Sequence, residues 1–137
     1  MGLLDITPKS YEKYFNRETE LSCHCGCGIC EISELFMMKI LKIRETLQFP
    51  LPVTSGYRCP SHNRTVSGKS VGSHTMGHAV DILVSGLKAF KLSQAAMDAG
   101  ITGIGWKQHG SHSGRYIHLD DLTEEDGFKR PTIWSYP

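Results

Sequence analysis

The stretch SHTMGHAVD, residues 73–81, combines two histidines, a glycine and an aspartate, and it leads directly into the apolar run ILV. A carboxylate buried among apolar side chains is costly unless a counter-charge or a metal ion neutralises it. His74 stands seven residues before Asp81, and Gly77 between them can bend the chain so that both side chains meet. The rest of the sequence must therefore supply the partner that makes Asp81 tolerable in an apolar strand.

Hydrophobic patterns predict helices and strands on both sides of this stretch. Apolar residues recur at helical spacing over 31–49 until two prolines end the helix, and 87–100 forms a second helix that ends at Gly100. Strands are expected at 52–55, 77–85, 101–108 and 115–121. This order of elements predicts an α+β fold, in which helices pack against an antiparallel sheet.

Three segments lack such a pattern and are expected to be irregular. Gly56 and Pro60 indicate a turn after the first strand, residues 67–73 form a Ser/Gly loop, and the tail after residue 121 carries two prolines. The 137 residues contain neither an internal repeat nor a linker. We therefore expect one domain over residues 1–137 with a single core.

Charge and hydropathy exclude several classes of partner. The formal net charge of +1 offers no basic stripe for nucleic acid. No apolar run approaches the roughly 20 residues of a membrane span. The first 15 residues lack a basic segment followed by an apolar one, so we expect no secretion signal. We therefore expect the protein to be made in the cytoplasm. A monomer without nucleic-acid or membrane partners is expected.

The last predicted strand carries side chains that complement Asp81. Because side chains alternate along a strand, Tyr116, His118 and Asp120 share one face. If the two strands are neighbours, His74, Asp81 and His118 can converge. Two imidazoles and one carboxylate leave a fourth position open for water, which is the pattern of catalytic zinc, although the same donors could hold iron(II).

Four of the five cysteines lie in SCHCGCGIC, as Cys23, Cys25, Cys27 and Cys30. Without a secretion signal, a disulfide framework is less favoured than reduced thiols or a metal site. The spacing is not that of a standard zinc finger, and together with the low net charge it argues against a zinc knuckle for nucleic acid. Reduced thiols, disulfides and a second, structural zinc stay open, the last with His24 or Cys59 as further ligands.

Three motifs occur in order: TSGYRCPSHN at 54–63, GSHTMGHAVDI at 72–82 and RYIHLD at 115–120. Together they resemble the zinc D-alanyl-D-alanine carboxypeptidase and peptidoglycan endopeptidase family, and in particular its small phage and bacterial cell-wall branch. The resemblance extends over residues 22–120, because the cysteine-rich stretch also resembles a segment of that branch. The Hedgehog signalling domain shares this fold and metal set, so the fold alone does not guarantee turnover.

The resemblance implies a Hedgehog/DD-peptidase-like fold with one catalytic Zn2+ bound by His74, Asp81 and His118. It also implies that Arg58 holds the scissile carbonyl or a substrate carboxylate. A guanidinium suits that role because its fixed donors can stabilise the charge that develops on an oxyanion.

The sequence departs from the family pattern at the general base. Family members carry a histidine two residues before the last metal histidine, or an acidic residue three before it, where this chain has Tyr116 and Arg115. Tyr116 could instead donate a hydrogen bond to an oxyanion. His112 and Asp120 are the expected substitutes for the base, with orientation of the neighbouring histidine as the other role for Asp120. His109 is a third choice.

The activity implied by the resemblance is hydrolysis of an amide bond in a peptidoglycan stem peptide or cross-link. An enzyme of this kind could reach the cell wall without a signal peptide if a phage holin released it or a virion carried it. The alternative is a catalytically inactive zinc-containing module that binds cell wall or builds part of a virion. The departure at the general base favours that alternative.

Overall fold

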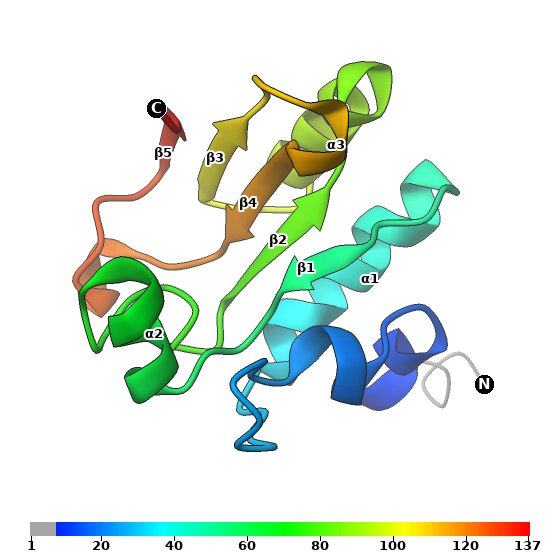
Figure 1. Cartoon of the computed structure of the whole chain (residues 1–137). Helices are drawn as coiled ribbons and strands as arrows, with labels where there is room; N and C mark the ends of the chain where they lie inside the picture. Colours follow the sequence, from blue (N-terminus) through cyan, green and yellow to red (C-terminus); the bar gives the residue numbers. More distant parts are fainter. Residues whose placement is uncertain (1–7) are drawn as a thin grey trace.

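A computed structural model describes residues 8–137. They form a five-stranded sheet, and helices pack against one of its faces (Figure 1). The strands are β1 (Val53–Ser55), β2 (Ala79–Leu83), β3 (Gly103–Lys107), β4 (Tyr116–Asp120) and β5 (Thr132–Ser135). Their order across the sheet is β1-β2-β4-β3-β5. The first four strands pair antiparallel, whereas β5 pairs with β3 in parallel at the edge.

Three α-helices accompany the sheet: α1 (Glu34–Leu47), α2 (Pro60–Ser67) and α3 (Gly86–Asp98). Shorter helical segments are η2 (Pro8–Lys13), η3 (Arg17–Leu21), η4 (His112–Gly114) and η5 (Glu124–Asp126). Within residues 8–137, no helix is both long enough and apolar enough to cross a membrane. The prediction about a secretion signal rests partly on residues 1–7, which lie outside the described part of the chain.

The sheet has one apolar face and one polar face because strand side chains alternate. Val80 and Ile82 of β2 and Ile117 and Leu119 of β4 are fully buried in the main hydrophobic cluster. Helices α1 and α3 contact each other and cover this face. The alternate residues of β2 and β4 therefore lie on the opposite face, and Asp81, between Val80 and Ile82, is one of them.

The predicted α+β fold is confirmed, and so are both predicted helices and the four predicted strands. The expected turn at Pro60 is wrong, because α2 begins there. This helix buries only Asn63, so it has no apolar period, and its N-cap is Cys59, whose thiol accepts a hydrogen bond from the backbone N–H of His62. Proline is favourable at the first helical position, so Pro60 begins a helix here instead of forming a turn.

The expected irregular tail is also wrong, because β5 adds a fifth strand to the sheet. Its pairing with β3 is parallel and joins segments far apart in the sequence, so no local turn signal announces it. The stretch TIWSY at 132–136 is rich in β-branched and aromatic residues, and this composition could have identified the strand.

Gly77 ties the loop before β2 to the segment before α1. Its φ is +76°, and its carbonyl accepts a hydrogen bond from the N–H of Ser33 at 2.7 Å. A Cβ on Gly77 would collide with the carbonyl oxygen of Glu31. The left-handed conformation and the close backbone approach both require glycine here.

Gly77→Ala is expected to lower the free energy of unfolding by about 3 kcal/mol or more, because left-handed strain and a backbone collision add together. Gly110→Ala is the matched control, since Gly110 has φ of +78° but open space around its Cβ. It should lose only about 1–2 kcal/mol from left-handed strain. Urea-unfolding midpoints measure both, and equal losses would contradict the argument.

Candidate metal centre

The pairing of β2 with β4 sets Asp81 directly opposite His118. The His118 Nδ1 atom lies 3.0 Å from Asp81 Oδ1, and the His74 Nε2 atom lies 3.4 Å from the same oxygen. All three side chains are buried, and their ligand atoms lie within 4.8 Å of one another. Two imidazoles and a carboxylate at this separation could hold a divalent metal ion.

His74 is oriented by the strand–helix connection before it. Its Nδ1 lies 2.7 Å from the carbonyl oxygen of Gly56, which can only accept a hydrogen bond. Nδ1 therefore carries a proton, and Nε2 is the nitrogen that faces Asp81. The N–H of Arg58 donates to the His74 carbonyl at 3.4 Å. The segments 56–58 and 74–81 thus form one connected unit.

His118 is oriented by Asp120, two residues along the same strand. The Nε2 atom of His118 lies 2.8 Å from Asp120 Oδ2. Asp120 is completely buried and also accepts hydrogen bonds from Arg130 Nε at 2.9 Å and from its Nη2 at 2.8 Å. An imidazole held by a carboxylate on one nitrogen presents the other nitrogen to a metal in a defined direction.

The ionisation of these groups favours a cation. Burial raises the pKa of the Asp81 carboxyl, but hydrogen bonds from His118 and His74 outweigh burial, and the pKa lies below its ordinary range. The pKa of Asp120 is lowered in the same way, where burial is outweighed by Arg130 and His118. Burial lowers the pKa of His118, but Asp120 and Asp81 outweigh it and raise that pKa. Both carboxylates are therefore charged at neutral pH.

Arg58 lies beside the triad in a fixed position. Its Nη2 atom is 3.7 Å from Asp81 Oδ2. Its Nε donates to Ser55 Oγ at 3.1 Å, and its Nη1 donates to Asn63 Oδ1 at 3.1 Å. Ser55 ends β1 and Asn63 is the buried residue of α2, so the TSGYRCPSHN motif supplies both the guanidinium and its two supports.

The tail brings aromatic residues to the same face, which the sequence reading missed. The ring of Trp134 lies 5.3 Å from the ring of His118, and the ring of Tyr136 lies 5.4 Å from that of Tyr116. The guanidinium of Arg130 stacks 4.9 Å from the Trp134 ring. The end of the chain therefore forms one wall of the site.

Gly105 of β3 makes room for this wall. It pairs with His118 on one side and with Trp134 on the other, and a Cβ there would lie 2.5 Å from Trp134 Nε1. Any side chain at this position would displace the indole from the histidine. The glycine in this strand is thus explained by the close approach of the tail.

Tyr116 and Tyr136 stay protonated at neutral pH. Burial raises the pKa of Tyr136 to about 12, against a smaller lowering by a hydrogen bond with Trp134. Burial and the charge of Asp81 raise the pKa of Tyr116, and Arg58 lowers it less. Both hydroxyls can therefore donate hydrogen bonds beside Asp81.

The remaining histidines lie elsewhere. His112 is exposed in η4 and lines a hollow with Pro52, Leu83 and Lys88, so its role as a base stays a prediction. His109 is exposed in the turn between β3 and β4.

His78 lies off the triad and is half-buried. Its Nδ1 atom is 2.7 Å from Asp121 Oδ1. Lys39 also binds Asp121, with its Nζ 2.8 Å from Oδ2.

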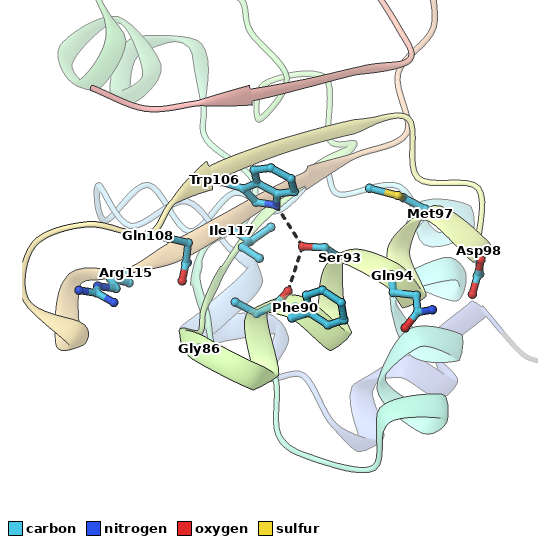
Figure 2. Close-up of a pocket in the computed structure, with 11 residues that line it drawn as sticks. Gly86, Phe90, Ser93, Gln94, Met97, Asp98, Trp106, Gln108, Arg115 and Ile117 are labelled. Atoms are coloured by element: carbon cyan, nitrogen blue, oxygen red, sulfur yellow. Dashed lines mark hydrogen bonds between the residues drawn. The ribbon is translucent and has the colours of Figure 1, made fainter.

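A hollow of about 670 Å³ lies on the other face of the sheet, between α3 and the strands (Figure 2). Phe90 and Met97 of α3 line it together with Trp106, whose Nε1 donates to Ser93 Oγ at 3.0 Å. Ile117 also lines it and points away from the face that carries His118. The hollow is therefore separate from the metal-type ligands.

A family model described as Peptidase M15 matches residues 13–120. No curated protein matches the chain. The matched range contains the triad and Arg58 and ends at Asp120, so the contacts of Arg130, Trp134 and Tyr136 lie beyond it.

Asp120→Asn is expected to weaken zinc binding about 10- to 100-fold, because the carboxylate that orients His118 is lost. The control is Asp121→Asn, since Asp121 also binds a histidine and a basic side chain but lies off the triad. Competition with a chromophoric chelator measures the zinc affinity. Zinc that Asp81→Ala still binds is subtracted, because it is bound away from the triad. Equal affinity in Asp120→Asn and wild type would contradict this role.

Zinc affinity at the triad is expected to rise with pH across the weakly acidic to neutral range, by up to about tenfold per unit for one displaced proton. The pKa of His118 is raised, so in the metal-free protein this imidazole keeps its second proton at pH values above the ordinary histidine pKa of about 6.5. Zinc must displace that proton. In the metal-free protein the same shift stabilises the fold at low pH, and this contribution is lost as pH rises through the raised pKa. Chelator titrations at several pH values test this, and a flat profile would contradict it.

Proposed function

The chain belongs to the peptidase M15 family, whose model matches most of its length, and from this premise we propose a zinc-dependent peptidase that cleaves peptidoglycan. Members of the family are metal-dependent peptidases, so the substrate class is a peptide. The bond that we propose is an amide of a stem peptide or cross-link, cleaved by carboxypeptidase or endopeptidase action. The observation that carries the proposal is the buried set His74, Asp81 and His118 with Arg58 beside it.

The donor set fits zinc, because two imidazole nitrogens and one carboxylate leave a position for water or substrate. A zinc ion held by His74, Asp81 and His118 would supply a Lewis acid that activates water and polarises the scissile carbonyl. The orientation of each histidine by a second group, the Gly56 carbonyl or Asp120, supports a metal in preference to a simple ion-pair cluster.

Arg58 is proposed to hold the scissile carbonyl or a substrate carboxylate. Its side chain is only 15% exposed and is fixed by Ser55 and Asn63, so little reorganisation is needed when charge develops on the substrate oxygen. Tyr116 and Tyr136 add protonated hydroxyl groups close enough to Asp81 for its charge to raise the pKa of both. These donors and the guanidinium together favour an oxyanion over the neutral carbonyl.

Asp120 is proposed as a positioning residue. Its lowered pKa and its bonds to Arg130 and His118 make it a poor proton acceptor at neutral pH. His112 is retained as the proposed general base. It lies on a short helical turn directly before β4, and its exposure leaves the side chain free to turn.

The proposal extends to a monomer that reaches the cell wall after release by a holin or carriage in a virion. This part rests on the resemblance of the three motifs to the phage and bacterial cell-wall branch of the family. The competing function is an inactive zinc-containing module that binds cell wall or builds a virion. The absence of the family's usual base favours that alternative, because Tyr116 and Arg115 occupy the two positions where family members carry a histidine or an acidic residue.

Purified peptidoglycan fragments, incubated with zinc-loaded protein and analysed by mass spectrometry, test the proposal. Wild type should form a product, and the mass of that product identifies the bond. Asp81→Ala should form none, because the triad loses its only carboxylate, while Asp121→Asn should stay active. His112→Ala should lose activity if it is the base, with His109→Ala as its control.

No product from several wall chemistries, formed by protein shown to hold an Asp81-dependent zinc ion, would decide for the inactive module. Product formed equally by Asp81→Ala would exclude the triad as the catalytic centre.

A further inference from the structure

A second group of metal-type ligands lies apart from the triad, on the loop before α1 and at the start of α2. Its members are Cys23, Cys25, Cys27 and Cys59, and their sulfur atoms all lie within 4.8 Å of one another. The Cys23 and Cys25 sulfurs are 3.4 Å apart, and the Cys25 and Cys59 sulfurs are 3.7 Å apart. A segment of the loop and a residue 34 positions away in sequence thus meet at one point.

These separations suit one metal ion better than disulfides. A tetrahedral zinc with Zn–S bonds of about 2.3 Å places its sulfurs roughly 3.8 Å apart. A disulfide brings two sulfurs to about 2.05 Å, and all five cysteines are free thiols. Four converging thiols close a tetrahedral shell completely, which is the arrangement of structural zinc.

The backbone around the cluster is arranged to support thiolates. The N–H of Cys59 donates to the Cys23 sulfur at 3.3 Å, and the N–H of His62 donates to the Cys59 sulfur at 3.4 Å. Hydrogen bonds of this kind stabilise negative charge on metal-bound sulfur. Gly26 and Gly28 both have positive φ, of +95° and +74°, so the loop can turn its thiols inward.

The fourth thiol of this cluster belongs to Cys59, which the sequence offered only as a further ligand, and not to Cys30. Cys30 packs against the hydrophobic core, and its carbonyl accepts a hydrogen bond from Arg17 Nη2 at 2.9 Å. Cys59 is the N-cap of α2, where its thiol lies beside those of the loop. Only the fold brings these residues together.

We propose that Cys23, Cys25, Cys27 and Cys59 bind a second zinc ion with a structural role. This ion connects the loop to the segment 56–59. The same segment contains Arg58 and the carbonyl group that orients His74. Gly56 orients His74, and Arg58 immediately precedes Cys59. The structural ion therefore braces the segment that positions Arg58 and one ligand of the catalytic site.

The first test is the zinc content of purified proteins by elemental analysis, with Cys30→Ser as the matched control for Cys59→Ser. Wild type and Cys30→Ser should each hold two ions per chain. Cys59→Ser should lose the cysteine-bound ion, and Asp81→Ala should lose the ion of the triad and keep the other. Cys25→Ser, which changes an exposed residue, repeats the test if Cys59→Ser fails to fold.

The second test is cobalt substitution in Asp81→Ala, which isolates the cysteine site from the triad. Thiolate-to-cobalt charge transfer and intense tetrahedral d–d bands are expected, and adding Cys59→Ser should abolish them while adding Cys30→Ser should not. The proposal would be overturned if wild type held only one zinc ion, if Cys59→Ser kept that ion, and if cobalt-substituted Asp81→Ala showed no thiolate bands. Neither readout requires peptidase activity, so failure of this site and failure of the proposed function are distinguishable.

Discussion

The pairing of Asp81 with His118 across β2 and β4 is the interaction on which the rest of the site depends. A carboxylate can be buried there because two imidazoles and a guanidinium surround it. A shift of one residue in this register would turn Asp81 toward the apolar face under α1 and α3. The register therefore serves both folding and the candidate metal site.

A four-residue segment, 56–59, connects the candidate metal centre with the cysteine cluster. Gly56 holds His74, Arg58 lies against Asp81, and Cys59 joins the cysteine cluster and begins α2. A Cβ on Gly56 would meet the backbone of Leu21, which shows how closely the N-terminal segment abuts it. A disturbance on either side of the segment should reach the other through a short, well-bonded stretch of backbone.

The tail completes the polar face from the far edge of the sheet. Arg130 neutralises Asp120 with two hydrogen bonds, and Trp134 lies against His118, where Gly105 leaves space. These contacts lie beyond the range that the family model matches. The matched part thus contains the triad and Arg58, while the tail supports His118 through Asp120 and adds the hydroxyl of Tyr136.

Periodicity and motif spacing in the sequence determined the α+β class, most of the strands and helices, and the candidate ligands His74, Asp81 and His118, because those signals are local. Only the tertiary structure decided that β5 pairs with β3, that Asp120 lies between His118 and Arg130, and that Cys59 replaces Cys30. Each of these depends on contacts between segments distant in the chain, and no local pattern encodes which distant residue will be the partner.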